Sequence, residues 1–563
     1  MMDADRLKEI IALGEAVGRE FKSDRRKISD AEIYEEVVAM ANADGGVLLI
    51  GVENDGTVSG AQPRHEETTD PIRLQSAIFN NTSPNINTRI SVPEIQGRKV
   101  ISIEVDIYPE ICATAQGKVI RRIIGPDGKP ATVPFLPHDQ RSRRVDLGLI
   151  DFSAQLMEDA SFESFDPLEF ERLRQTITRL RGDQSLKDLS NEEIAKALQL
   201  VETQGDRLIP NVAGLLLLGR EEIVRKILPT HEVHFQVLDA QGDVKVNDAF
   251  HRPLLHVLSE VESRFAARNE EREVMVGMFR VPVPDYSPIG FREAVSNALL
   301  HRDYTRLDAV YVQWQPDHLL ITSPGGFPVG ITAENLLVHE PKPKNPRLAA
   351  ACRRIGVVEQ TGRGVDKIYM GQVRYGRPIP DYSRSDSTGV RVVIRGGKPS
   401  LDFSAFVFEQ EGQGKKLELD DLLILNALFH ERRIDVASAC ALIQRGATET
   451  KSALERLLER GLVEPRGERR ARTYHLSGMV YKRLNMEAEY IRAKGFEPYQ
   501  HEQMVLDYVR KMGRITRSEA ADMCHLSGYQ ASRLLRRIAE KYERFQMVGK
   551  RKGAYYTWSE AAE

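Results

Sequence analysis

A segment near the middle of the chain, Phe291–Tyr304, carries the side chains whose types and spacing best suit chemistry. Glu293 and Asn297 are four residues apart, so a helix through this segment places them on one face. A glutamate of this kind polarises a water molecule, and an asparagine oxygen is a ligand that Mg²⁺ accepts. The pair therefore predicts a nucleotide site in which Asn297 holds Mg²⁺ and Glu293 is a candidate base.

Two glycine-rich turns follow this segment, at Ser323–Gly330 and Glu359–Asp366. Because glycine has no side chain, the backbone amides of such turns come close enough to bind phosphate oxygens. The helix and both turns in this order favour nucleotide binding. The alternative is a degenerate fold that binds nothing, in which the glycines merely turn the chain. The candidate nucleotide-binding residues are Glu293, Asn297, Ser323, Gly325, Gly326, Lys344, Gly362 and Gly364.

The C-terminal end of the chain has the composition of a polyanion-binding surface. Residues 497–558 hold 12 Lys and Arg against 7 Asp and Glu, a local net charge of +5, whereas the whole chain carries −3. Three helices and then two strands around a basic turn are expected there, which predicts a winged helix-turn-helix module on double-stranded DNA. Its candidate contacts are Gln530, Ser532, Arg533 and Arg537 on the third helix, Tyr529–Lys541, and Lys550, Arg551 and Lys552 on the wing.

A similar module is expected just before it, at residues 416–484. Its three helices are predicted at 422–430, 436–443 and 448–460, and its basic wing spans Arg466–Arg472. Modules of this kind also bind proteins or form dimers, so a protein-binding scaffold stays open as an alternative. The candidate DNA contacts of this module are Thr450, Lys451, Arg456, Arg469, Arg470 and Arg472.

Hydrophobic patterns outline the elements that position these residues. The N-terminal region is expected to hold a helix at Asp30–Ala43, capped by Ser29 or Asp30, before a strand at Val47–Val52. Further strands are predicted near 87–92 and 99–107, and Gly125–Arg144 is predicted as loop. In the middle region, strands are predicted at Ala213–Leu218, Val310–Gln315, His318–Ser323 and Val390–Ile394, with a helix at Phe291–Leu300 between them.

A chain of 563 residues is too long for one ordinary core, so a multidomain fold of α/β and α+β parts is expected. The expected divisions are an N-terminal α/β domain at 1–145, a connector at 146–189, a second α/β region at 190–400, a linker at 401–415, and the two C-terminal modules at 416–484 and 497–560.

Composition excludes several classes of protein. The chain is 41% hydrophobic and 29% charged, which is typical of globular proteins, and its apolar runs are too short to cross a membrane. The N-terminus lacks the pattern of a signal peptide. Four scattered cysteines offer neither disulfide pairs nor zinc ligands at the usual spacings, so we expect a cytoplasmic protein without zinc.

The helix and glycine turns of the middle region resemble GHKL-type ATPases, in the divergent form found in bacterial proteins classed as transcriptional regulators. The resemblance covers roughly 190–400 and implies a Bergerat-type α/β sandwich with Asn297 on Mg²⁺ and residues 325–364 as glycine turns and lid. Lys342, Lys344 and Arg347 fall in this lid and are expected to reach phosphates. The family's first glycine motif usually begins with an aspartate that reads adenine, and here Ser323 takes that place.

The N-terminal region resembles the AlbA-like domain of the Schlafen group. The residues that carry the resemblance are Glu15–Lys22 and Met40–Gly60, with a glycine pair after a helix and a strand ending in Gly-Val. This domain commonly accompanies the ATPase-like region, so the two resemblances support each other. The resemblance implies a nucleic-acid-associated α/β domain over about 1–140.

In Schlafen nucleases, two glutamates with this spacing and a later acidic residue form a metal-dependent RNA-cleaving centre. Glu15 and Glu20 match, and the third position falls near Glu53 or Asp55. Carboxylates that converge hold Mg²⁺ or Mn²⁺ and activate water at a phosphodiester. The candidates to hold the nucleic-acid backbone are Lys22, Arg121 and Arg122. The alternative is structural, with Glu20 in an ion pair and Asp55 in a turn.

The patterns together predict a nucleotide-regulated DNA-binding protein, a transcriptional regulator that binds ATP and Mg²⁺ and forms a homodimer or higher homo-oligomer. The first alternative is a Schlafen-like metal-dependent nuclease, acting on RNA or DNA in anti-phage defence. The second alternative is the protein-binding scaffold.

Overall fold

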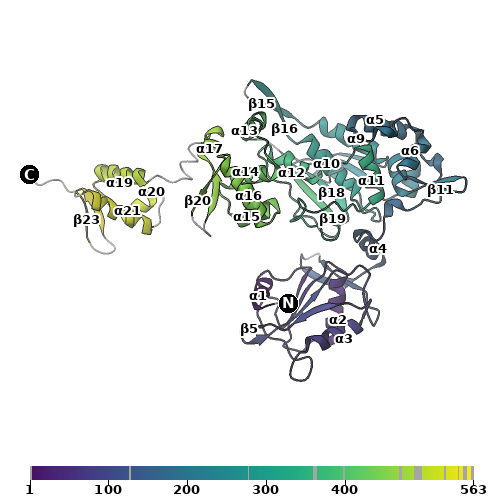
Figure 1. The fold of residues 1–563 in the computed structure, drawn as a ribbon, viewed down its shortest axis with the longest axis horizontal. Coiled ribbons are helices and arrows are strands. Elements are labelled where there is room, and N and C mark those ends of the chain that lie inside the picture. The colour runs from purple at the N-terminus through teal and green to yellow at the C-terminus, as the bar shows by residue number, and fades with distance from the viewer. Residues whose placement is uncertain are drawn as a thin grey trace, which may run out of the picture. The chain divides into compact units, whose positions relative to one another are not determined.

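The computed structural model of the chain describes residues 3–125, 128–276, 278–358, 364–396, 400–467, 472–486, 498–524, 528–542, 544–549 and 554–558. The chain divides into two compact units (Figure 1). Unit 1 comprises residues 1–272, 284–372 and 378–398, and unit 2 comprises 273–283, 373–377 and 399–563.

The N-terminal part of unit 1 is built on a four-stranded sheet with strand order β1-β2-β7-β4. β1 (Arg19–Lys22) runs parallel to β2 (Gly46–Ile50). β7 (Ile101–Val105) is antiparallel to both β2 and β4 (Thr88–Ser91). The strands predicted in this region are therefore confirmed.

Helix α2 (Asp30–Ala41) covers this sheet and begins where the sequence predicts. Ser29 caps it, because the Ser29 side chain and that of Glu32 each accept a hydrogen bond from the other residue's backbone amide. Val37, Val38 and Met40 lie in a core with the strands. The other elements of this part are α1 (Ala4–Ala12), α3 (Pro71–Asn80), β3 (Thr82–Ser83), β5 (Glu94–Ile95), β6 (Arg98–Lys99), β8 (Ala113–Thr114) and β9 (Ile120–Ile124).

The prediction of loop at Gly125–Arg144 is wrong. This stretch contains β10 (Pro130–Pro134), which pairs with β9, and most of helix α4 (Pro137–Asp146). Pro137 stands in the first turn of α4, where the missing amide hydrogen of proline costs no helical hydrogen bond.

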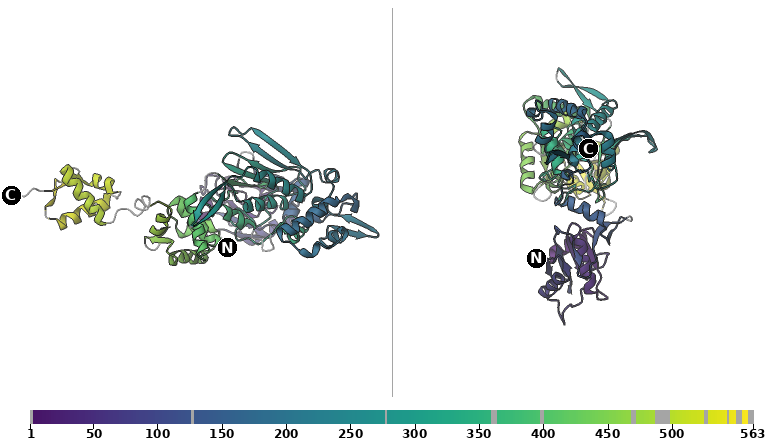
Figure 2. Two further views of the ribbon diagram at one scale, coloured as in Figure 1. Left: turned by 90° about the horizontal axis from the view of Figure 1, so that it is seen from above. Right: turned by 90° about the vertical axis from the view of Figure 1, so that its right-hand side faces the viewer.

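Residues 146–234 form a mainly helical part of unit 1. The predicted strand at Ala213–Leu218 is wrong, because these residues form helix α7 (Val212–Leu218), which is buried on all sides. A short apolar run without periodicity fits a buried helix as well as a buried strand. The hairpin of β11 (Val201–Gln204) and β12 (Arg207–Pro210) extends beyond the neighbouring helices (Figure 2). The other elements are η1 (Phe152–Ala154), η2 (Phe162–Ser164), α5 (Pro167–Leu180), η3 (Gln184–Leu186), α6 (Asn191–Ala197) and α8 (Glu221–Ile227).

A five-stranded sheet with order β14-β13-β17-β18-β19 forms the rest of unit 1. β13 (Val233–Leu238) is parallel to β17 (Val310–Trp314), and the other pairings are antiparallel. The predicted strands at Val310–Gln315, His318–Ser323 and Val390–Ile394 are confirmed. The remaining elements are β14 (Val244–Phe250), α9 (Leu254–Ala266), α10 (Pro288–Leu300), β18 (His318–Pro324), α11 (Pro346–Ile355), α12 (Gly364–Val373) and β19 (Gly389–Arg395).

Helix α10 packs against β17, β18 and α9 (Figure 1). The rings of Phe265 on α9 and Phe291 on α10 stack with centroids 3.9 Å apart. The helix begins at Ser287, whose hydroxyl accepts a hydrogen bond from the backbone amide of Gly290. This packing turns one side of α10, with Glu293 and Asn297, toward α12 and the end of β18.

The linker predicted at 401–415 is mostly helix. Residues Leu401–Gly412 form helix α13, which buries Phe403, Phe406 and Val407. Phe403 lies 5.1 Å from Phe429, measured between ring centroids. The buried residues lie in the first half of the helix, whereas its second half, which ends in Glu-Gln-Glu-Gly, gives the polar pattern that predicts a linker.

Two groups follow α13, each with three helices and a small antiparallel sheet in the order that the sequence predicts, and the first group ends with a further short helix. The first group holds α14 (Leu419–Glu431), α15 (Val436–Ile443), α16 (Ala447–Glu459), β20 (Val463–Arg466), β21 (Thr473–Leu476) and α17 (Gly478–Arg483). The second group holds α19 (Pro498–Met512), β22 (Arg514–Thr516), α20 (Arg517–Cys524), α21 (Gly528–Lys541), β23 (Phe545–Val548) and β24 (Tyr555–Trp558), as Figure 1 shows in yellow. A hairpin of β15 (Glu271–Val276) and β16 (Phe279–Pro284) completes the described elements.

None of the helices in the described ranges has both the length and the apolar character that crossing a bilayer requires.

The burial of α13 generates a prediction about stability. Replacing Phe403 by Ala removes a fully buried ring, and we expect the free energy of unfolding of this part to fall by about 3–5 kcal/mol. Urea denaturation followed by hydrogen exchange of α13 and α14 measures the loss. Leu401→Ala is the control, because Leu401 is exposed on the same helix. Equal stability of the two variants would mean that residues 401–412 act as a linker after all.

Candidate functional site

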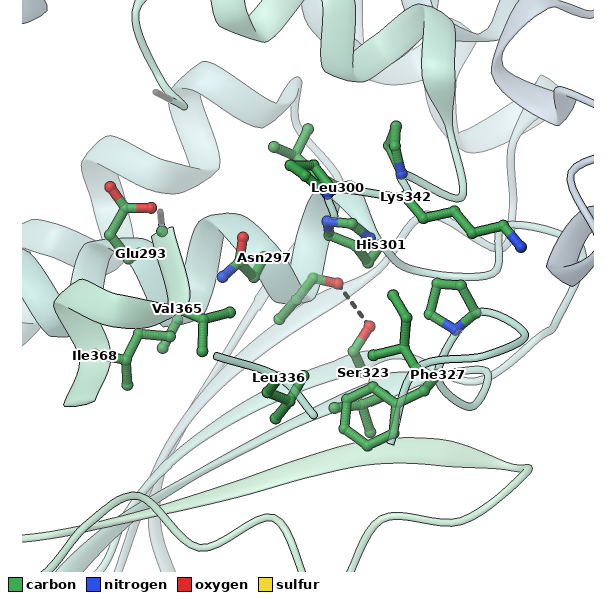
Figure 3. Close-up of a pocket in the computed structure, with 18 of the residues that line it drawn as sticks. Glu293, Asn297, Leu300, His301, Ser323, Phe327, Leu336, Lys342, Val365 and Ile368 are labelled. Atoms are coloured by element: carbon green, nitrogen blue, oxygen red, sulfur yellow. Dashed lines mark hydrogen bonds between the residues drawn. The ribbon is translucent and has the colours of Figure 1, made fainter. Parts of the chain in front are cut away.

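A cavity of about 200 Å³ lies in unit 1 between α10, α12 and the ends of β18 and β19. Figure 3 shows Glu293, Val365 and Ile368 toward one end of it, and Phe327 and Lys342 toward the other. Burial, followed by the charge of Lys344, lowers the pKa of His301 to about 4, so this lining side chain is neutral at pH 7. The polar residues of the lining include Glu293, Asn297, His301, Ser323, His339, Lys342 and Arg353.

Glu293 and Asn297 both line this cavity, as the helical spacing predicts. The Glu293 side chain is 2% exposed, and its Oε1 atom lies 2.9 Å from the Nζ atom of Lys367 on α12. A Cβ atom added to Gly364 would lie 2.8 Å from the Glu293 Oε2 atom. Gly364 therefore lets α12 begin close to the Glu293 carboxylate, and a side chain at this position would displace the end of the Glu293 side chain.

Ser323 lies at the end of β18 and lines the cavity with Gly326. The Ser323 hydroxyl donates a hydrogen bond of 2.6 Å to the backbone carbonyl of Ala298 on α10. This bond joins the strand to the helix, so the hydroxyl has a structural partner as well as a face on the cavity. Gly362, another candidate of the sequence analysis, lies outside the described residues.

The structure corrects the placement of Lys344 and Gly325. Lys344 is buried, and its Nζ atom lies 2.8 Å from the Asp146 Oδ1 atom of helix α4, away from the described lining of the cavity. Gly325 packs beside it, because an added Cβ would lie 2.9 Å from the Lys344 Nζ atom. Burial raises the pKa of Asp146, although Lys344 acts in the opposite direction. The ion pair of Lys344 with Asp146 holds α4 against the segment that precedes α11.

The other two cations of the expected lid differ in position. Lys342 lines the cavity, and its Nζ atom donates a hydrogen bond of 3.1 Å to the backbone carbonyl of Val329. Arg347 begins α11, where its backbone amide donates to a carboxylate oxygen of Asp151. Arg353 on α11 also lines the cavity, and the sequence analysis missed it. Its position in the last turn of α11, beside Arg354, gives no local sign of such a role.

In the N-terminal part, four charged side chains form a compact cluster. The Lys22 Nζ atom lies 2.7 Å from Glu20 and 2.9 Å from Glu36, and Arg122 contacts the same two carboxylates. Burial alone would lower the pKa of Lys22, but the hydrogen bonds to both glutamates outweigh it and raise the pKa. The sequence analysis did not include Glu36, which reaches the site from α2, 16 positions after Glu20.

The assignment of Arg121 and Arg122 to the nucleic-acid backbone is wrong for this conformation. The Arg122 side chain is 1% exposed and also donates hydrogen bonds to the carbonyls of Ala16 and Val17. Arg121 is paired with Asp139 at 2.9 Å. These guanidinium groups face acceptors of the protein itself, so they are unavailable to phosphates.

The other carboxylates of the predicted nuclease centre have local partners. Glu15 accepts a hydrogen bond from the amide of Phe21, and Glu53 is 3.2 Å from Arg25. Asp55 accepts one from the amide of Thr57, as in the turn that the structural alternative describes. Within the described ranges, no three His, Cys, Asp or Glu side chains are grouped so that they could hold a metal ion.

The two C-terminal groups of helices differ in how they present the predicted contacts. In the first group, Thr450 is fully buried and bonds to the Gly446 carbonyl, so its assignment to DNA is wrong. Arg456 pairs with buried Asp421 at 2.9 Å, while Lys451 and Arg472 are exposed. The candidates Arg469, Arg470, Lys550, Arg551 and Lys552 lie outside the described residues.

Helix α21 of the second group separates its residues as predicted. Leu534, Leu535 and Ile538 are buried in a core with α19, and Ala531 lies with them. Ser532 is half-buried and donates a hydrogen bond to the Gly528 carbonyl. The exposed side chains of this helix include Gln530, Arg533, Arg536 and Arg537.

Comparison with protein families agrees with this organisation. Residues 15–129 match the Schlafen, AlbA_2 family, and residues 308–394 match the family described as "Putative ATP-dependent DNA helicase recG C-terminal". The second match begins after Asn297 and covers β17 to β19. Residues 146–234 match a domain of unknown function. The chain therefore combines a Schlafen AlbA_2 domain with an ATPase-type domain. This combination indicates a nucleic-acid-related ATP-binding protein.

No curated protein matches the chain. Among solved structures, the DIP2311 protein from Corynebacterium diphtheriae is similar, with 21% sequence identity and a TM-score of 0.51. The similarity covers 85% of this chain and 97% of that one. At this level of identity the similarity shows the fold alone.

The two lysines of the expected lid make a matched test of these positions. Lys344→Met leaves Asp146 buried without its partner, so we expect the free energy of unfolding to fall by about 3 kcal/mol. Lys342→Met should change it by about 0.5 kcal/mol or less. Denaturation of each variant measures the difference, and Asp146→Leu combined with Lys344→Met should recover most of the loss. If Lys344→Met were as stable as the unaltered protein, the ion pair with Asp146 would not be needed for folding. Lys344 would then again be a candidate contact for phosphates.

Proposed function

We propose that this chain is a nucleotide-regulated DNA-binding protein that acts as a transcriptional regulator. The observation that carries the proposal is the division of helix α21, which buries its leucines and exposes Arg533, Arg536 and Arg537. Exposed arginines at the surface of a helix-turn-helix suit phosphates and guanine edges in the major groove. In this proposal α19 to β24 form a winged helix-turn-helix, with α21 as its recognition helix.

The first group of helices has the same order of elements and supports a second, weaker DNA contact. Lys451 on α16 and Arg472 beside β21 are exposed and suited to phosphates. Arg456 is held by Asp421, so its contribution requires that this ion pair open. Two modules on one chain increase the affinity for DNA when both engage at once.

The cavity of unit 1 is the proposed nucleotide site, in a Bergerat-type fold. Asn297 supplies an oxygen for Mg²⁺, and Lys342 and Arg353 supply positive charge for phosphates. The ATPase-type family match over residues 308–394 supports ATP as the ligand. ATP controls DNA binding in this proposal only if it binds one conformation better than the other. A homodimer suits two-fold symmetric DNA sites.

The DNA proposal is tested on helix α21. We expect the double variant Arg533→Ala/Arg537→Ala to weaken binding of a fluorescent DNA duplex and to reduce the slope of log K against log salt by about 2, which is about 1 for each lost phosphate contact. Lys511→Ala, an exposed cation on α19, is the control and should keep the slope. Binding without salt dependence in the unaltered protein would favour the protein-binding scaffold instead.

A second candidate function, metal-dependent cleavage of RNA or DNA, has one observation in its favour. Glu20 and Glu36 both contact the same two cations, so their carboxylates lie close together in the Schlafen AlbA_2 domain. If Mg²⁺ or Mn²⁺ displaced Lys22 from them, the pair would supply oxygen ligands. Glu15, Glu53 and Asp55 are the further candidates in this proposal.

Cleavage is tested with fluorescent single-stranded RNA and duplex DNA, with Mg²⁺ or Mn²⁺ and with EDTA. A nuclease shortens a substrate only with metal, and Glu20→Gln or Glu15→Gln abolishes the cleavage while DNA affinity stays nearly intact. Glu35→Gln, a change on α2 next to the cluster, is the control and should cleave normally. Intact substrates under every condition would remove the nuclease and leave the regulator.

A further inference from the structure

The carboxylate of Glu293 is engaged on both sides, although it lies at the end of the cavity. Its Oε1 atom is paired with the Nζ atom of Lys367 at 2.9 Å. Its Oε2 atom faces Gly364, so closely that a Cβ atom on this residue would lie 2.8 Å away. Gly364 and Lys367 are three residues apart on α12 and lie on one face of that helix. Helix α12 therefore pairs with one oxygen of the carboxylate and lies close to the other.

Hydrolysis of ATP requires a base that is free to turn toward the attacking water. The water oxygen bonds to the γ-phosphorus, the bond from that phosphorus to the bridging oxygen breaks, and ADP leaves with the electron pair. The proton of the water passes to a base that must lie within about 2.6–3.2 Å of the water oxygen. The ammonium group of Lys367 engages one oxygen of Glu293, so the ion pair holds the carboxylate toward α12.

The nucleotide ligands proposed above do not depend on this pair. Asn297 lies one helical turn further along α10 and lines the same cavity, as does Lys342 (Figure 3). Arg353 lines it from α11. Lys367 is 25% exposed, whereas Glu293 is 2% exposed. The ammonium group thus lies at the outer side of the pair, from which it can leave without unfolding α10.

We propose that Lys367 restrains Glu293, so that the cavity holds ATP as a ligand and does not hydrolyse it while the ion pair is closed. This inference rests on the proposed function, since it assumes that the cavity binds ATP. Lys367 is a positioning residue in this account, because it acts on the nucleotide only through Glu293. A site that does not hydrolyse its ligand suits a regulator. The fraction of the protein with ATP bound then depends on the concentration of ATP and does not fall through hydrolysis after binding.

The test compares Lys367→Met, which removes the charge, with Lys367→Arg, which keeps it. We expect the unaltered protein and Lys367→Arg to bind Mg·ATP and to release it intact. Lys367→Met should bind with an affinity within about threefold of the unaltered protein and hydrolyse ATP about tenfold faster or more, through kcat rather than KM. Titration calorimetry measures the binding, and chromatography of the recovered nucleotide measures the hydrolysis. Adding Glu293→Gln to Lys367→Met should return hydrolysis to the original level.

The outcomes separate the inference from the function on which it rests. Binding of ATP with unchanged hydrolysis in Lys367→Met overturns the inference and leaves the nucleotide site standing. Rapid conversion of bound ATP by the unaltered protein also overturns it, and this measurement needs no variant. Absence of ATP binding in the unaltered protein removes the proposed nucleotide site itself. If Lys367→Met does not fold, Lys367→Gln takes its place with the same expectations.

Discussion

Helix α10 places the carboxylate of Glu293 in the interior of unit 1, and the packing of α12 against α10 depends on how this charge is paired. The helix lies between α9 and the sheet, so Glu293 loses nearly all of its contact with water. A buried carboxylate is costly unless it is paired and hydrogen-bonded. Lys367 supplies the partner, which requires α12 to begin directly against α10, and Gly364 makes that approach sterically feasible. The same contact lies at one end of the cavity.

The pairing of buried charges also decides which cations remain for ligands. Lys344 is used by Asp146, Arg122 by Glu20 and Glu36, and Arg456 by Asp421. In each case the carboxylate is itself largely buried, so removing the cation would leave an uncompensated charge. The cations that line the cavity are Lys342 and Arg353, and the cations exposed to water include those of helix α21. This distribution places the proposed ATP site in unit 1 and the proposed DNA surface at the end of unit 2.

The comparisons describe the domains that accompany these sites. A Schlafen AlbA_2 domain and an ATPase-type domain occur on one chain, and a solved structure with 21% identity has a similar fold over most of it. Fold similarity at that level is shared by proteins of different function. The difference between a regulator and a nuclease therefore depends on particular side chains, above all on whether the carboxylates beside Lys22 take up a metal.

The sequence alone determined those features that depend on neighbouring residues. Helix α2 with a cap at Ser29 or Asp30, the strands β17, β18 and β19 and the division of α21 into buried leucines and exposed arginines follow from local spacing. The sequence analysis missed β13 and β14 of the same sheet. It could not show that Ala213–Leu218 is helical, since a wholly buried run has no periodic pattern. Only the tertiary structure decided which charges pair, because Lys367 and Glu293 are 74 positions apart and meet through the packing of two helices. Residues that the sequence assigned to phosphates, such as Lys344 and Arg122, turned inward for the same reason.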